Sequence, residues 1–129
     1  RNKTKMALAA ARVMFRPQQC LYQRMVMRSF SSPVVKPLSM LVYDFVEDMA
    51  NKRTPYRAEH LQIVNEAAER GELLLGGAFQ EIDGGVMLFT TAEAAEKFAM
   101  SDPYVLQDLV DSFNIRNLSM VGGTLHKHM

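Results

Sequence analysis

The order of the periodic segments in the second part of this chain constrains its fold more than any other feature of the sequence. Apolar stretches rich in β-branched and aromatic residues predict strands at 39–46, 72–80, 86–89 and 111–118. Helical patterns predict helices at 55–70 and 92–100, with a short third helix from 103 to about 110. The resulting order, β-α-β-β-α-β, predicts a ferredoxin-like α+β fold with its helices on one face of an antiparallel sheet.

Turn and capping residues mark the ends of these segments. Thr54 and Pro55 form an N-cap followed by proline at the first helical position, and Gly71 ends that helix. Thr91 caps the second helix, whose predicted apolar stripe is Ala94, Ala95 and Phe98. The second strand should be mostly buried, and its Gly76-Gly77 pair predicts a bulge or a close backbone approach. Asp83-Gly84-Gly85 predicts the hairpin turn that follows. Local signals and periodicity therefore agree on the same arrangement.

A sheet covered by helices on one face leaves its other face open. Apolar side chains on that face need a partner, and a second copy of the chain is the simplest one. At 129 residues the chain has room for one domain, and domains of this size often gain stability by oligomerising. We therefore expect a homodimer.

The N-terminal part differs sharply from the rest in charge. Residues 1–43 carry eight Lys and Arg and no acidic residue, whereas residues 44–129 carry seven Lys and Arg and all fourteen Asp and Glu. An acid-free segment with Arg and Ser that forms an amphipathic helix is typical of a mitochondrial transit peptide. On a helical projection Lys5, Arg12 and Arg16 share one sector, beside an apolar sector.

A processing site fits the same interpretation. The run from Arg28 to Ser32 resembles a mitochondrial cleavage site, with cleavage expected after Phe30. We therefore expect residues 1–37 to be a presequence or basic arm with a linker, and the protein to be mitochondrial, in the matrix or facing it. Two alternatives remain open at this point: a generic basic tail, or a retained arm that binds RNA or anionic lipid through aromatic residues among its arginines.

Several classes of function find no support in the sequence. A single cysteine, Cys20, rules out an internal disulfide framework and a multi-cysteine zinc site. No apolar run is long enough to span a bilayer. The paired glycines lack the G-x-G-x-x-G frame of a dinucleotide site, and no Ser or Cys nucleophile lies in a recognisable motif. We therefore expect no cofactor, no metal and no DNA partner, and we assign 121–129 as a C-terminal tail.

Three residues stand out as candidates for chemistry. His60 faces inward on the first helix, beside Leu61, Val64 and Ala67, and is compatible either with a histidine satisfied by a backbone carbonyl or with a general base. Asp102 precedes Pro103, so helix capping explains it as well as catalysis does. Arg57 is either a solvated residue of the first helical turn or an anchor for a substrate carboxylate. Spacing alone does not choose between these interpretations.

Taken in order, the motifs of residues 38–120 resemble a YciI-like (YCII-related) domain. The shared pattern is Arg57-x-x-His60-Leu61, Gly71-x-Leu73-Leu74-x-Gly76-Gly77, Gly85, and Phe98-Ala99-x-Ser101-Asp102-Pro103-Tyr104-Val105. The resemblance implies a dimeric α+β barrel in which two ferredoxin-like sheets pack face to face. It also implies a His–Asp pair as catalytic site, which falls on His60 and Asp102. The segment between Phe79 and Gly85 is short for this pattern, with little material to wall a pocket.

Two functions follow from these observations. One is a mitochondrial, cofactor-free enzyme for a small molecule, in which His60 transfers a proton, Asp102 orients it, and Arg57 and Tyr104 contact the substrate. Lyase, isomerase and dehalogenation chemistry all suit such a pair. The other is a non-catalytic accessory subunit of a large mitochondrial assembly, a respiratory complex or the mitochondrial ribosome, that retains residues 1–37 as a contact arm.

Overall fold

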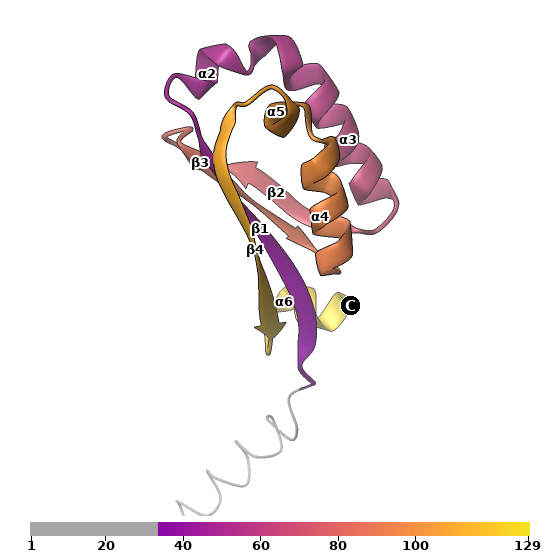
Figure 1. Cartoon of the computed structure of the whole chain (residues 1–129). Coiled ribbons are helices and arrows are strands. Elements are labelled where there is room, and N and C mark those ends of the chain that lie inside the picture. Colours follow the sequence, from indigo (N-terminus) through magenta and orange to yellow (C-terminus); the bar gives the residue numbers. More distant parts are fainter. Residues whose placement is uncertain (1–33) are drawn as a thin grey trace, which may run out of the picture. The chain divides into compact units, whose positions relative to one another are not determined.

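Four antiparallel strands form one sheet in the computed structural model, which describes residues 34–129 (Figure 1). The strands are β1 (Lys36–Phe45), β2 (Leu73–Ala78), β3 (Gly84–Phe89) and β4 (Val110–Met120). Their order in the sheet is β2-β3-β1-β4, and every neighbouring pair is antiparallel. The predicted ferredoxin-like α+β fold is confirmed. The predicted presequence helix and cleavage site lie outside the described residues.

The two long helices pack on the same face of this sheet (Figure 1). They are α3 (Arg57–Glu69) and α4 (Ala92–Ser101), accompanied by the short helices α2 (Met49–Lys52), α5 (Pro103–Leu106) and α6 (Thr124–His128). Tyr43 and Leu41 of β1 and Phe89 of β3 are fully buried beneath them. Burial of these side chains supplies the main driving force that holds the helices to the sheet.

Helix α4 begins and packs as its sequence predicts. The Thr91 hydroxyl accepts a hydrogen bond from the backbone N–H of Ala94 at 3.1 Å, which satisfies one of the free donors of the first turn. Ala95, Phe98 and Ala99 are the buried residues of the helix, and Ala94 is partly buried. The predicted stripe is therefore confirmed and extends by one residue.

Helix α3 begins later than predicted. Residues Thr54–Tyr56 form a 3-10 turn, and Thr54 makes no side-chain cap, so the α-helix proper starts at Arg57. Its covered face carries His60, Ile63, Val64 and Ala67, whereas Leu61 is exposed. The predicted inner face also included Arg57, Leu61 and Ala68, which are exposed, and it omitted Ile63, which is partly buried. The observed face is therefore rotated slightly from the predicted one. The preceding α2 was not predicted.

The β2–β3 hairpin also departs from its prediction. The turn comprises residues 79–83, and both Gly84 and Gly85 belong to β3. A Cβ on Gly84 would lie 2.5 Å from the carbonyl oxygen of Tyr43, and one on Gly85 would lie 2.8 Å from that of Gly77. These glycines are therefore required by close packing of backbone on backbone, not by the turn.

Strand β2 is mostly exposed, contrary to prediction, because it is the edge strand of the sheet. Its register shifts between Leu73 and Leu75, so the irregularity lies before the Gly76-Gly77 pair and not at it. The close approach predicted as the other possibility is found between Gly77 and Gly85. An edge position depends on the order of strands within the sheet, which local periodicity does not encode.

The chain after β4 is not the plain tail that the sequence predicts. Residues Thr124–His128 form the short helix α6, and the Lys36 ammonium donates a hydrogen bond to the carbonyl oxygen of His126 at 2.6 Å. The third predicted helix is shorter than expected, because α5 ends at Leu106 and β4 already begins at Val110. Among the helices of residues 34–129, none has the length and apolar character needed to cross a membrane.

The sheet face opposite α3 and α4 is apolar at its centre. Strand pairing places Met40 beside Leu88 and Val42 beside Val86 on this face. At its sides Leu75 and Leu118 are 58% and 43% exposed. We call this the open sheet face, defined by Met40, Val42, Leu75, Val86, Leu88 and Leu118.

Candidate functional site

A single buried carboxylate brings three distant segments together. Asp102, which is 0% exposed, accepts a hydrogen bond on Oδ1 from Nδ1 of His60 at 2.9 Å and on Oδ2 from the Tyr43 hydroxyl at 3.0 Å. Its Oδ1 also accepts from the backbone N–H of Tyr104 at 2.9 Å. Three donors around one carboxylate satisfy its acceptors and suit its ionised form.

The Asp102 side chain is held in place by the local fold. It caps α5 through Tyr104, and Pro103 occupies the first helical position, as the sequence predicts. Capping and the contact with His60 use the same oxygen, Oδ1. Asp102 therefore caps α5 and contacts His60 with the same side chain, and its catalytic role stays a prediction.

The contact with Asp102 selects the tautomer of a neutral His60 ring. Because an ionised carboxylate only accepts, the favoured tautomer carries its proton on Nδ1 and its lone pair on Nε2. The ring of His60 stacks on Tyr104, with centroids 3.9 Å apart and planes 9° from parallel, and meets the edge of Phe98 at 6.3 Å. The His60 side chain is 14% exposed, so it is mostly covered but reaches a cavity.

Tyr43 is the third member of this network. Burial raises the pKa of its hydroxyl far above the usual value, and the neighbouring charge of Asp102 raises it further. The hydroxyl therefore keeps its proton at neutral pH and donates it to Asp102. By binding Oδ2 of the carboxylate, it also fixes the position of Oδ1, the oxygen that contacts His60.

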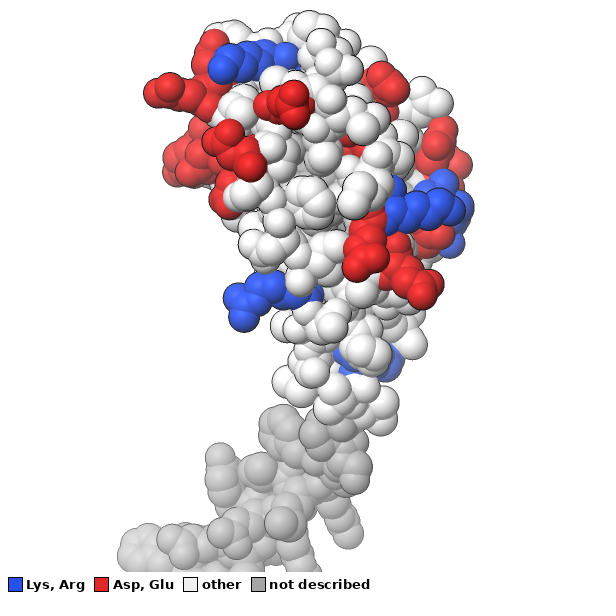
Figure 2. Space-filling model, in the orientation of Figure 1, with Lys and Arg blue, Asp and Glu red and all other residues white. Residues whose placement is uncertain are grey.

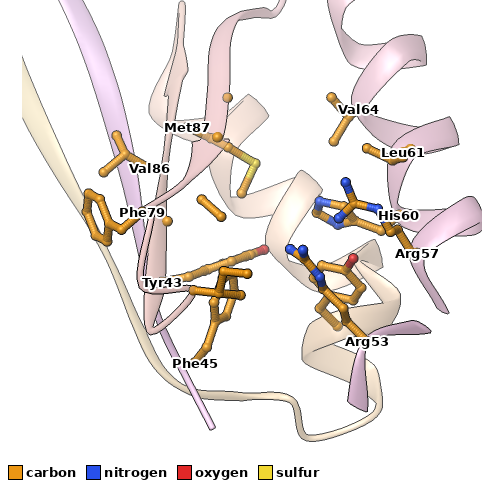
Figure 3. A pocket seen from close by; sticks show the side chains of 16 residues that line it. Tyr43, Phe45, Arg53, Arg57, His60, Leu61, Val64, Phe79, Val86 and Met87 are labelled. Atoms are coloured by element: carbon orange, nitrogen blue, oxygen red, sulfur yellow. The ribbon is translucent and has the colours of Figure 1, made fainter. Parts of the chain in front are cut away.

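A cavity of about 420 Å³ lies between α3 and the sheet, beside this network (Figure 3). Its floor is formed by residues with little or no side chain, Gly76, Ala78 and Gly85. They lie on the helix-facing side of the sheet, where Gly76 pairs with Met87, Ala78 pairs with Gly85, and Gly85 also pairs with Tyr43. Larger side chains at these positions would fill the space. Its apolar walls are Phe45, Leu61, Val64, Ile82 and Met87. Ile82 comes from the short segment between Phe79 and Gly85, which was expected to offer little material for a pocket wall; this segment supplies one side chain, and α3 and the sheet supply the others.

Two arginines line the same cavity on its helical side (Figure 3). Arg57 begins α3, and Arg53 lies just before the 3-10 turn that precedes it. Burial raises the pKa of Tyr104, and the positive charges of Arg53 and Arg57 partly offset that rise, which locates both guanidinium groups near the tyrosine hydroxyl. The cavity thus combines an imidazole, two guanidinium groups and two tyrosines with apolar walls.

Three of the four residues predicted for the site, Arg57, His60 and Tyr104, line this cavity, and the fourth, Asp102, is buried in contact with His60. His60 and Asp102 form the hydrogen bond described above, while Arg57 and Tyr104 line the cavity beside them. Arg53 was missed, because its position depends on the unpredicted α2 and 3-10 turn. The contact of Tyr43 with Asp102 was also missed, although its alternation with Leu41 does place it on the helix-facing side of the strand.

Metal ligands do not converge in the described part of the chain. Within residues 34–129, no three His, Cys, Asp or Glu side chains are arranged to hold a metal ion. His126 and His128 both belong to α6, away from the cavity lining.

Comparison with known proteins places this site in a family. Residues 38–119 match the family model of the YCII-related domain. No curated protein matches the chain. Solved structures similar to it include a NIPSNAP family protein from Agrobacterium tumefaciens str. C58, with 18% identity over 64% of this chain and 90% of that one and a TM-score of 0.45. A second nipsnap family protein of unknown function from the same organism has 14% identity over 69% and 90%, with a TM-score of 0.43.

A third similar structure is a protein from Shewanella oneidensis, with 13% identity over 65% of this chain and 89% of that one and a TM-score of 0.40. The family match, in contrast, covers most of β1 and β4 and everything between them, including every residue of the network around Asp102. The chain belongs to the family of YCII-related domain proteins.

Proposed function

We propose that this YCII-related domain is a cofactor-free enzyme that transfers a proton on a small molecule, with His60 as the general base. The observation that carries the proposal is the contact of 2.9 Å between His60 Nδ1 and the buried carboxylate of Asp102. It leaves Nε2 as the basic atom of a ring that lines a cavity. A base oriented by a carboxylate is the usual arrangement for proton abstraction by histidine.

The reaction follows from these positions. Nε2 of His60 takes a proton from a C–H or O–H group of the substrate, and the electron pair left behind forms a new double bond. In an isomerase the imidazolium returns the proton to another atom of the substrate; in a lyase or dehalogenase a leaving group departs with its bonding electrons. Asp102 stabilises the imidazolium through the Nδ1 contact and acts as a positioning residue, assisted by Tyr43.

Exchange of substrate protons with solvent tests this role while the natural substrate is still unidentified. The full chain is incubated in D₂O with candidate unsaturated and carbonyl compounds, and loss of individual substrate proton signals is followed by NMR. We expect His60→Gln to abolish exchange, and Asp102→Asn to lower kcat by roughly 10²-fold or more with a smaller change in KM. Arg70→Gln, at the end of the same helix but outside the cavity, is the control. Exchange that persists unchanged in His60→Gln sinks the proposal.

We further propose that the protein is a mitochondrial homodimer. The acid-free, basic residues 1–43 support the location, and the open sheet face supports a second copy as partner. Native size in gently solubilised mitochondria, with N-terminal sequencing of the same band, is the direct test. A band of twice the subunit mass supports a free dimeric enzyme. Migration with a very large complex, with residues 1–37 retained, argues instead for the accessory subunit.

A further inference from the structure

We propose that the cavity binds a small unsaturated or aromatic monocarboxylate, whose anionic end lies between Arg53 and Arg57 and whose hydrocarbon part lies on the apolar wall. The inference rests on the proposed proton transfer by His60 and specifies the substrate class for it. Three features of the cavity carry it: guanidinium groups without an acidic partner, the apolar walls and the volume.

Both cavity arginines lack a carboxylate partner within the protein. Across residues 34–129, the ion pairs are His60 with Asp102 and Arg70 with Glu72, so neither Arg53 nor Arg57 is neutralised by an acidic side chain. No Asp or Glu of the described residues lines the cavity. A guanidinium presents a planar fork of donors that matches a carboxylate, and two of them facing one space favour an anion there.

The hydroxyl of Tyr104 points to the same place. Tyr104 is 2% exposed, and its hydroxyl oxygen is buried without a hydrogen-bond partner among the described residues. Arg57 lies beside this hydroxyl. The hydroxyl is too deeply buried to touch a ligand itself, but it adjoins the guanidinium group on which the anionic end of the ligand is placed.

Overall charge does not account for anion binding here. Figure 2 shows acidic side chains outnumbering basic ones on the face that it displays, and residues 44–129 carry twice as many acidic as basic residues. Such a surface repels anions at long range. Any preference for a carboxylate must therefore come from Arg53 and Arg57 inside the cavity.

The volume and walls define the rest of the ligand. A cavity of about 420 Å³ lies near the lower end of the range of roughly 300–1,000 Å³ for small-molecule sites, which favours a small metabolite over a nucleotide. Phe45, Ile82 and Met87 offer apolar surface to its hydrocarbon part. Proton abstraction by His60 without a cofactor requires a C–H or O–H acidified by an adjacent unsaturated group. The glycines of the site form no phosphate-binding loop, so we assign a carboxylate as the anion.

Binding of chosen probes tests the inference on the full chain. Benzoate, salicylate and sorbate serve as planar monocarboxylates, benzamide as the uncharged counterpart of benzoate, and phenyl phosphate as the dianion. Affinities are measured by calorimetry and by amide chemical-shift changes, and circular dichroism verifies that each variant is folded. We expect a monocarboxylate to bind at least about tenfold more tightly than benzamide, because charge-assisted hydrogen bonds are the stronger class.

The variants separate the anion site from the catalytic proposal. Arg53→Gln and Arg57→Gln should each weaken monocarboxylate binding about tenfold or more and leave benzamide unchanged, while Arg70→Gln, which removes the same charge outside the cavity, should have no effect. Three results would overturn the inference. They are an unchanged affinity for the monocarboxylate in both cavity variants, no binding of any monocarboxylate to the wild type, and tighter binding of phenyl phosphate than of the monocarboxylates. His60→Gln should keep the affinity for the monocarboxylate. If it also keeps proton exchange, the catalytic proposal fails while the carboxylate site stands.

Discussion

His60 and Tyr104 stack face to face, with ring centroids 3.9 Å apart and an angle of 9° between their planes. The two residues belong to α3 and α5, which are joined by this stack and by the shared contact with Asp102. Stacking fixes the plane of the imidazole, and the hydrogen bond to Asp102 fixes its rotation within that plane. The ring is therefore held in one orientation before any ligand binds, which is what a proton-transfer site requires.

The two buried tyrosines of the site should respond differently to the same substitution. Tyr43→Phe removes a buried hydrogen bond to a charged group and should lower the free energy of unfolding by about 1.5–3 kcal/mol. Tyr104→Phe removes a hydroxyl with no partner in the described part of the chain and should change it by less than about 0.5 kcal/mol, or increase it. Urea denaturation of both variants and the wild type measures the difference. Equal losses in the two variants would contradict the assigned contacts.

Stability should fall in alkali, and Tyr43 should account for part of the fall. Its pKa is raised in the folded protein, so above about pH 10 the unfolded chain loses this proton while the folded chain keeps it. The stabilising contribution is thus present below that pH and is lost as pH rises, by up to about 1.4 kcal/mol per pH unit. Urea denaturation between pH 9 and 11 should therefore show a shallower decline for Tyr43→Phe than for the wild type. Parallel curves would rule out a raised tyrosine pKa.

Two glycines of the same hairpin should differ in their tolerance of a methyl group. Gly85→Ala would bring a Cβ to 2.8 Å from the carbonyl oxygen of Gly77, a backbone atom that cannot move aside without disturbing the strand pairing. We expect a loss of about 2 kcal/mol or more, comparable to overpacking of a core. Gly77→Ala meets no atom within 4 Å and serves as the matched control, with a change below about 0.5 kcal/mol. Thermal unfolding compares the pair, and a stable Gly85→Ala protein would mean that β2 and β3 are farther apart.

A charge at the centre of the open sheet face should separate the proposed dimer. Val42 lies between Val86 and Asn114 on this face, and Val42→Glu would bury a carboxylate without a partner in any interface built there. Light scattering should give twice the subunit mass for the wild type and a single subunit mass for the variant. Asn65→Glu, an exposed position on α3, is the control for added charge. A wild-type protein of single subunit mass would refute the dimer.

The sequence was most informative where a signal is local. The order of the four strands and the two long helices, the Thr91 cap and the capping position of Asp102 all depend on neighbouring residues, and each is found as predicted. The pairing of His60 with Asp102 came from resemblance to the family, because no local rule joins residues 42 positions apart. Family resemblance therefore supplied the long-range contact that periodicity could not.

The missed features share a different physical origin. The exposure of β2 follows from its place at the sheet edge, and the need for Gly84 follows from the carbonyl of Tyr43 on another strand. Arg53 reaches the cavity only because the chain before α3 forms a short helix and a 3-10 turn. Each depends on how distant segments or irregular turns are arranged, and such information is not contained in a window of neighbouring residues.

The carboxylate of Asp102 also has a consequence for the order in which the molecule is made. Its partners Tyr43 and His60 precede it by 59 and 42 positions, and its third donor follows it by two. The imidazole of a growing chain therefore has no fixed orientation until synthesis has passed Tyr104. In addition, β1, α3 and α5 must have packed against one another. Any truncated or partly folded form lacks the oriented imidazole, so the proton transfer proposed for His60 should be confined to molecules that have completed their tertiary structure.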